Sequence, residues 1–363
     1  MLSRVADSIY WLNRYIERAE NVARFLDVNL NLLLDMPSGM QQQWKPLVAT
    51  TGDIDLFKER YGDFTAENVI QFLVFDRKYP NSILSCLQSA RENARSVREI
   101  ISSEMWEQVN TFYMLISKAH LDLSLPKLNA LLTDVKESSH LFAGVMEATM
   151  SHNEAWNFGK IGRFLERADK TSRILDVKYF MLLPASTYVG TTIDELGWMV
   201  LLRSASAYEM YRKRSTQHRI TPAGVAEFLI LDPEFPRSIR FCLFQVERSL
   251  HQITGTPMGM WRNTVERNVG RVRSELEYVT IAEIVNAGMH EFLDRLQGQM
   301  NVIDQNIFDE FLSRTPIGKK EAAPKAQTQT QSPDQTQGQS PDQSPDQTQG
   351  QSPDQSQRQT QSV

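Results

Sequence analysis

Ten charged residues at helical spacing are the side chains of this sequence best suited to chemistry. They lie in two stretches, 14–28 and 163–177, which repeat the same charge pattern at an offset of 149 residues. Carboxylates can exchange protons, and guanidinium groups bind carboxylates through two parallel hydrogen bonds. The matched positions are Arg14 and Arg163, Glu17 and Glu166, Arg18 and Arg167, Glu20 and Asp169, and Arg24 and Arg173.

Each stretch predicts an amphipathic helix, because apolar and charged residues separate to opposite sides at about 100° per residue. An exposed ion pair on a helix contributes only about 0.2–0.5 kcal/mol. A merely solvated face should therefore have drifted between the copies, as the apolar positions have. Two stronger interpretations stay open. The charges form a buried network between the copies, where losing one partner costs about 3–5 kcal/mol, or they line a site for a charged ligand.

Glu17 and Glu166 are the acid/base candidates within these stretches. If the two carboxylates approach each other, the negative charge of one raises the pKa of the other. The neighbouring arginines would counteract that shift, so acid/base chemistry is the minor hypothesis.

The repetition extends beyond the charged stretches. The segment 44–60 matches 198–214 at an offset of 154, and 65–87 matches 221–243 at an offset of 156. No run of alternating β-branched residues is long enough to predict a sheet. The sequence therefore predicts an all-α fold, a helical bundle built from two sequence-related halves, 1–149 and 150–315, packed into one body.

Several helix boundaries can be predicted within this bundle. Thr65 and Thr221 have the residue type and position of N-caps. Pro80 and Pro236 are expected to begin longer helices, since proline is tolerated in a first turn. The apolar periodicity from Ile281 to Leu312 predicts one continuous helix.

Composition limits the classes of function. The chain has 363 residues, a net charge of −5 and arginines interleaved with acids, which does not indicate nucleic-acid binding. No apolar run approaches 18 residues, and the N-terminus shows no signal-peptide pattern, so a cytoplasmic protein without a membrane span is expected. Cys86 and Cys242, at equivalent places in the two halves, are expected to be buried, reduced thiols.

Motifs for cofactors and metals are missing from the sequence. It has no glycine-rich phosphate loop, no Gly-x-Ser-x-Gly elbow and no cysteine pair at metal spacing, so no cofactor and no metal are predicted. His140 and His290 match across the repeat but are expected to pack or to form hydrogen bonds between helices. From residue 316 to 363 the chain consists mainly of Gln, Ser, Thr, Pro, Asp and Gly, which predicts a disordered tail.

The doubled Arg-x-x-Glu-Arg-Ala-acid-x-x-x-Arg pattern resembles the bacterial alpha-E family, an all-helical domain of unknown function. The resemblance covers the chain to about Ser313. The family's Glu-x-x-x-Arg spacing falls on Glu20 with Arg24, and the second copy departs from it with Asp169 and Arg173.

This resemblance implies a function. Members of the family are typically encoded beside, or fused to, a circularly permuted ATP-grasp protein, often with a transglutaminase-like protease. It implies a non-catalytic helical partner or scaffold of an ATP-grasp amide or peptide ligase. The alternative is a hydrolase or transferase that acts on the peptide product of that system, with Glu17 and Glu166 as acid and base.

Overall fold

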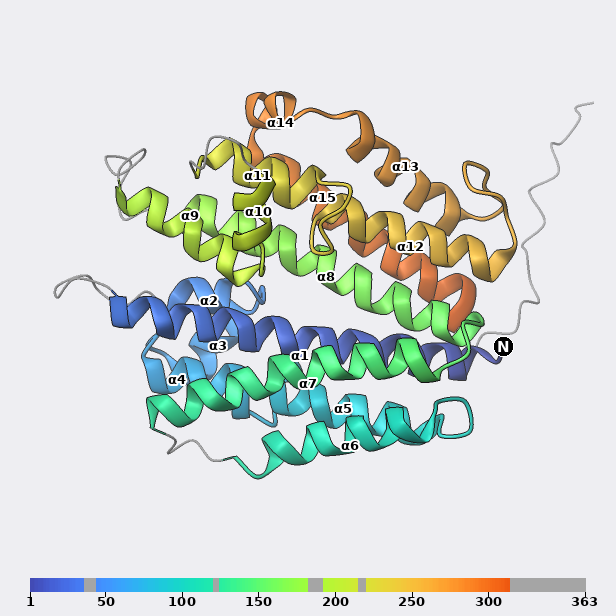
Figure 1. The fold of residues 1–363 in the computed structure, drawn as a ribbon, viewed down its shortest axis with the longest axis horizontal. Coiled ribbons are helices and arrows are strands. Elements are labelled where there is room, and N and C mark those ends of the chain that lie inside the picture. Colours follow the sequence, from blue (N-terminus) through green and yellow to red (C-terminus); the bar gives the residue numbers. More distant parts are fainter. Residues whose placement is uncertain (36–43, 120–123, 182–191, 215–219, 314–363) are drawn as a thin grey trace, which may run out of the picture. The chain divides into compact units, whose positions relative to one another are not determined.

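The computed structural model describes residues 1–35, 44–119, 124–181, 192–214 and 220–313, all within the segment Met1–Thr315. These residues form helices and no strand, which confirms the predicted all-α class (Figure 1). The first helices are α1 (Ser3–Asp35), α2 (Lys45–Ala49), α3 (Ile54–Tyr61), α4 (Ala66–Ile70) with a π-helical turn (Gln71–Phe75), α5 (Ile83–Ser96), α6 (Ser103–Ser117) and α7 (Leu125–Thr149). They are followed by α8 (Glu154–Met181), α9 (Thr192–Ser204), α10 (Tyr208–Arg214), α11 (Pro222–Leu231), α12 (Ile239–Thr254), α13 (Thr264–Tyr278), α14 (Ile281–Ala287), α15 (Met289–Ile307) and a second π-helical turn (Phe308–Leu312).

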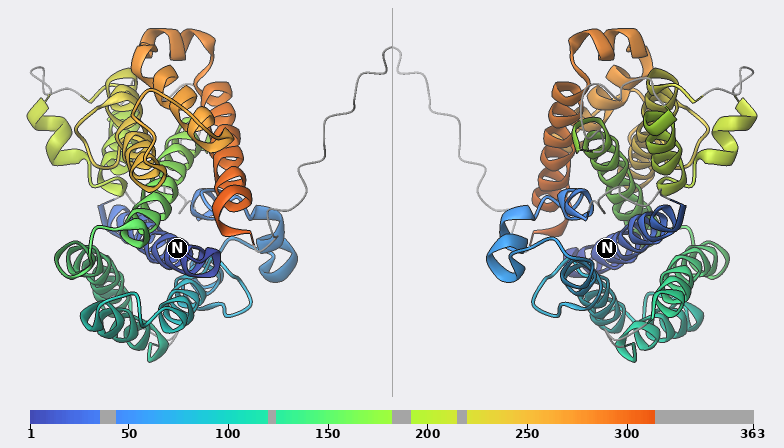
Figure 2. Two further views of the ribbon diagram at one scale, coloured as in Figure 1. Left: turned by 90° about the vertical axis from the view of Figure 1, so that its right-hand side faces the viewer. Right: turned by 90° about the vertical axis from the view of Figure 1, so that its left-hand side faces the viewer.

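Two long helices, α1 and α8, pack against each other at the centre of this body. Helix α1 also packs on α5 and α7, and α8 packs on α12 and α15 (Figure 2). The outer helices pair in the same order, with α6 between α5 and α7, and α13 between α12 and α15. Both charged stretches lie on the two central helices.

A glycine permits the close approach of α1 and α8. A Cβ atom on Gly162 of α8 would lie 2.4 Å from the Tyr10 carbonyl oxygen of α1, too close for any side chain without backbone movement. Around this contact the central helices bury their apolar faces, including Ile9, Ala19 and Ala168, each fully buried. The side chains of the two helices can therefore reach each other directly.

The predicted N-caps are confirmed. The Thr65 hydroxyl accepts a hydrogen bond from the Asn68 amide, and the Thr221 hydroxyl accepts one from the Gly224 amide. Each of these bonds satisfies an amide that the first turn of a helix leaves unpaired.

The prediction that proline begins the next helix in each half was wrong. Helices α5 and α12 begin three residues after Pro80 and Pro236, where Ser82 and Ser238 accept hydrogen bonds from the amides three residues ahead. A serine N-cap satisfies one of these amides, which a proline cannot do, so the helix starts at the serine.

The predicted continuous helix from Ile281 to Leu312 is broken at Gly288. Its φ of +98° lies outside the helical region and is adopted readily only by glycine. Helix α14 therefore ends at Ala287 and α15 starts at Met289. The apolar periodicity continues through the break, so the pattern of hydrophobic residues did not reveal it.

The two cysteines are free and buried, as predicted, on α5 and α12. Burial raises the pKa of both thiols to about 12. Neither thiol is a reactive nucleophile in the folded chain.

Candidate functional site

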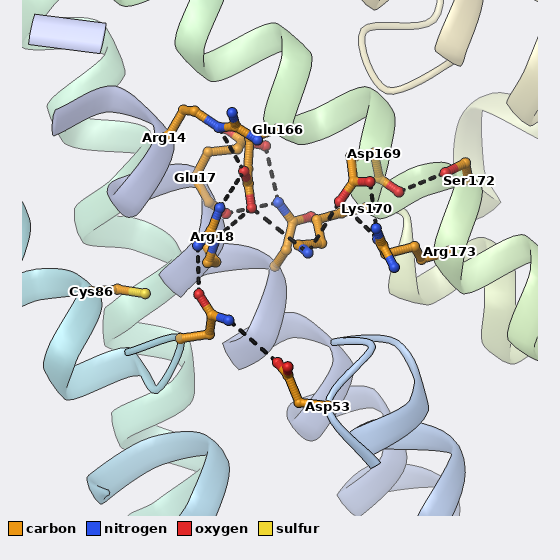
Figure 3. Close-up of polar contacts among 12 residues, drawn as sticks. Arg14, Glu17, Arg18, Asp53, Cys86, Glu166, Asp169, Lys170, Ser172 and Arg173 are labelled. Carbon is orange, nitrogen blue, oxygen red and sulfur yellow. Dashed lines mark hydrogen bonds and ion pairs between the residues drawn. The ribbon is translucent and has the colours of Figure 1, made fainter. Parts of the chain in front are cut away.

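The ten charged residues singled out in the sequence lie along the contact between α1 and α8. Figure 3 shows Arg14 and Arg18 of α1 reaching Glu166 of α8, with Asp169 and Arg173 on the following turn. Most of these side chains are buried, and Glu20 and Glu166 have no exposed surface. The structure thus excludes a solvated face.

Two reciprocal ion pairs form the centre of the site. Arg18 of α1 donates to both carboxylate oxygens of Glu166, with Nε to Oε1 at 2.6 Å and a terminal nitrogen to Oε2 at 2.9 Å. Arg167 of α8 donates to both carboxylate oxygens of Glu17 in the same manner, with Nε to Oε1 at 2.7 Å and a terminal nitrogen to Oε2 at 2.8 Å. Each Glu-Arg dipeptide therefore gives its carboxylate to one bidentate pair and its guanidinium to the other.

A further cation bridges two carboxylates on each side of this centre. On one side Arg237, in the turn before α12, lies 3.2 Å from Glu17 and 2.8 Å from Glu20. On the other side Lys170, on α8 itself, lies 3.7 Å from Glu166 and 3.2 Å from Asp169. The two bridging cations come from different elements but join matched pairs of carboxylates.

The outer pairs lie one turn along each helix. Arg24 pairs with Glu20, and Arg173 pairs with Asp169 through Nε at 2.9 Å, both at the i,i+4 spacing. These pairs extend the network toward the C-terminal end of both helices.

Matched arginines at the start of the stretches have unlike surroundings. Arg14 lies 3.0 Å from Glu166 and 2.6 Å from Asp304 of α15. Arg163 makes no hydrogen bond or ion pair with any residue that the structure describes, and its Nε is buried without a partner. Its guanidinium instead lies over the Phe164 ring, 5.1 Å from the centroid.

The carboxylates at the centre are held in the ionised form. Burial would raise the pKa of Glu17, but Arg167 and Arg237 lower it below its ordinary value. Burial acts on Glu166 in the same way, and Arg18 and Arg14 hold its pKa well below the ordinary range. A carboxylate without a proton cannot act as a general acid, and its oxygens are occupied by guanidinium groups. The geometry therefore does not support Glu17 and Glu166 as an acid and base.

The matched histidines lie at the edge of the network. His140 Nε2 is 3.6 Å from Glu20, and His290 Nδ1 is 2.7 Å from Asp176. A hydrogen bond with Asp176 raises the pKa of His290. Across the described ranges no group of three or more His, Cys, Asp or Glu side chains is placed to hold a metal ion.

The partner residues of the network were not predicted. Arg237 and Asn81 occupy matched positions at an offset of 156, and Lys170 and Asn21 occupy matched positions at an offset of 149. The residue type differs between the halves at both positions, so residues that are unchanged between the halves do not include them. Both asparagines belong to the half 1–149, and both cations belong to the half 150–315. The difference compensates within each side of the network, where Arg237 lies beside Asn21 on one side and Lys170 serves the side that has Asn81 on the other.

Comparisons with known proteins give a family. The Alpha-E family, described as a predicted alpha-helical domain with a conserved ER motif, matches residues 1–312. The description names an ER motif, which is Glu followed directly by Arg. The family resemblance had implied a different spacing, Glu-x-x-x-Arg, on Glu20 and Arg24.

Among curated proteins, the chain is similar to uncharacterized proteins of Mycobacterium bovis and Mycobacterium tuberculosis, each 24% identical over 292 residues. These matches cover 75% of this chain and 32% of each relative, so the chain spans about a third of the length of the curated relatives it matches. No solved structure matches the chain. No helix among the described residues is long and apolar enough to cross a membrane.

Proposed function

Because the chain belongs to the Alpha-E family, we propose that it is a non-catalytic helical partner of a circularly permuted ATP-grasp amide or peptide ligase. The observation that supports a non-catalytic role is the occupation of the motif carboxylates. Glu17 and Glu166 are each bound by a bidentate arginine and a second cation, which are structural contacts. Such a network positions two helices and leaves catalysis to a partner.

The ligase as partner comes from the resemblance to the family. The length of the relatives supports it, because about two thirds of each relative lies outside the match and another domain can occupy that length. We propose that the partnership forms in the cytoplasm. A transglutaminase-like protease is the second partner that the family resemblance suggests.

We assign the ER motif of the family to Glu17-Arg18 and Glu166-Arg167. Of the five Glu-Arg dipeptides in the chain, these two lie in the repeated stretches and bind each other. We further propose that the halves 1–149 and 150–315 arose by internal duplication, and that the motif fixes how the two copies pack. The tail 316–363, predicted from composition to be disordered, lies outside the described residues.

We place the docking surface for the ligase between α12 and α13. Met260 and Trp261 have side chains that are 65% and 60% exposed, whereas the matched Met105 in the other half is buried. Pro257 and Met258, just before them in the chain, line a hollow of about 580 Å³ together with Phe244 of α12. Exposed methionines and aromatics around a hollow are typical of protein contacts.

The test is capture of the full-length tagged chain from its own cells, with mass spectrometry of the proteins recovered. We expect an ATP-grasp protein at stoichiometric amounts. A Met260→Ser/Trp261→Ser variant should lower its recovery about tenfold or more, as loss of an aromatic anchor does at protein interfaces.

The matched control is Tyr278→Ser, which removes an aromatic side chain that is 82% exposed at the far end of α13. This variant should recover the ligase as the unaltered chain does. If no ATP-grasp protein is recovered with the unaltered chain, the partnership is refuted. Equal recovery by the Met260/Trp261 variant would refute only the docking surface.

A further inference from the structure

A small cavity beside the ion network carries an excess of positive charge. It measures about 20 Å³ and lies between α1, α7, α8 and the turn before α12. Its charged lining consists of one carboxylate, Glu17, and the three guanidinium groups of Arg163, Arg167 and Arg237. Glu17 is already bound by Arg167 and Arg237, so its charge is engaged within the network.

Arg163 is the cation of this lining that has no carboxylate partner among the described residues. The charges of Glu17 and Glu147 act on it, but neither carboxylate is within ion-pair distance among the described residues. Burial, together with the charge of Arg167, lowers the pKa of Arg163 to about 10. The matched Arg14 shows what such an arginine binds when an acid is present, namely Glu166 and Asp304.

The cavity has a route to solvent and a defined capacity. His140 lines it, and the side chain of this residue is 62% exposed. A volume of about 20 Å³ holds one water molecule or one small polar group, since a water needs roughly 10–15 Å³. A water would fill the space without balancing the charge, whereas a carboxylate would do both and match the planar fork of arginine.

We propose that this cavity is a carboxylate-binding site, in which Arg163 binds one carboxylate group that enters past His140. The group comes from the side chain or the C-terminus of a peptide, because a free carboxylate group on a flexible chain can enter so narrow a space. This site does not depend on the ligase partnership and can be tested on the isolated full-length chain.

The experiment titrates the full-length chain with sodium acetate at constant ionic strength, following the Nε–Hε resonance of Arg163 by NMR and the thermal midpoint. The resonance is identified by its loss in Arg163→Lys. We expect a saturable shift of that resonance and a rise of the midpoint with acetate concentration, because a ligand that binds only the folded state stabilises it. Acetamide, which has the same shape and no charge, should produce neither.

Two variants make the result specific. Arg163→Gln should weaken acetate binding about tenfold or more, the effect of losing a charged hydrogen-bond donor. Arg271→Gln, the same charge change at an exposed position on α13, should bind acetate as the unaltered chain does. The Arg163 variant should fold, because it loses no ion pair.

N-acetylglycine and N-acetylglutamate amide distinguish a terminal carboxylate from a side-chain carboxylate. Binding of either one in an Arg163-dependent manner supports the site. The proposal is overturned if acetate gives no saturable shift, if Arg163→Gln binds acetate equally well, or if chloride competes at the same concentration as acetate and shows that the cavity takes any small anion.

Discussion

At the scale of single residues, the two matched arginines Arg14 and Arg163 show that a residue's surroundings decide its contribution. Both begin a charged stretch, and both lie at the contact between the central helices. Arg14 has two acidic partners, whereas Arg163 has none among the described residues. Identical substitutions should therefore have opposite consequences.

We expect Arg14→Gln to lower the free energy of unfolding by about 3 kcal/mol, because it leaves the buried carboxylate of Glu166 with one cation fewer and removes the cation that pairs with Asp304. Arg163→Gln should change the free energy of unfolding by less than about 0.5 kcal/mol, or raise it, because it removes a cation that has no partner. Urea unfolding at neutral pH measures both values. Equal losses in the two variants would show that Arg163 has an ion pair in solution.

The ionised carboxylates also predict how stability depends on pH. The pKa values of Glu17, Glu20 and Glu166 are lowered by their arginine partners, against the effect of burial. A lowered pKa stabilises the folded state at every pH above the unfolded value of about 4.3, and this stabilisation is lost as the pH falls through the folded value. We therefore expect a level stability above about pH 5 and a steep loss below pH 4.

Urea midpoints between pH 7 and pH 3 measure this loss. The variant Glu17→Gln/Glu166→Gln should be less stable at pH 7 and should lose less stability on acidification, so that its curve approaches that of the unaltered chain at low pH. Parallel curves would mean that other groups cause the acid sensitivity.

At the scale of elements, the network is assembled from two helices and the turns that cover them. The bridging cation comes from the turn before α12 on one side, as Arg237, and from α8 on the other, as Lys170. The positions that lack the cation hold asparagine. Asn21 accepts a hydrogen bond from Arg237, and Asn81 accepts one from Arg18. The arrangement on the Arg237 side of the network can thus be converted into the arrangement on the Lys170 side by two substitutions.

Arg237→Asn should lower the free energy of unfolding by about 3 kcal/mol, since it leaves Glu17 and Glu20 with one cation fewer. Adding Asn21→Lys should recover about 1–2 kcal/mol, because a lysine there matches Lys170 in the other half. A double-mutant cycle by urea unfolding measures the coupling. Additive losses would show that a lysine at position 21 does not reach the two carboxylates.

The sequence predicted the helical class and singled out the ten charged positions, because period and charge are local properties. It did not show that Arg163, unlike Arg14, would lie outside the ion network. It also predicted both threonine caps. It did not predict Arg237 or Asp304, because their partners lie 220 and 290 residues away in the chain. The break at Gly288 was missed as well, since a single glycine leaves the apolar pattern around it unchanged.

At the scale of the whole helical body, the charged contact joins the two halves through their central helices. Helix α1 belongs to the first half and α8 to the second, and the bidentate pairs cross between them. Gly162 allows the close backbone contact that these pairs require. The halves should therefore unfold together.

Hydrogen exchange measured by mass spectrometry tests this cooperativity. In the Arg14→Gln variant we expect α5 and α12 to lose protection by the same factor, because loss of a contact between the halves affects both equally. If only α5 loses protection, the two halves open independently. Arg271→Gln, an exposed change within α13, serves as the control that leaves both helices protected.

The buried thiols of Cys86 and Cys242 allow the opening rate of each half to be measured separately. One lies on α5 and the other on α12, and burial keeps both protonated and out of reach of alkylating reagents. Each thiol can be alkylated only when its own half opens. The ratio of the two alkylation rates, read from one unmodified chain, therefore reports whether the halves have a common lifetime or two separate ones.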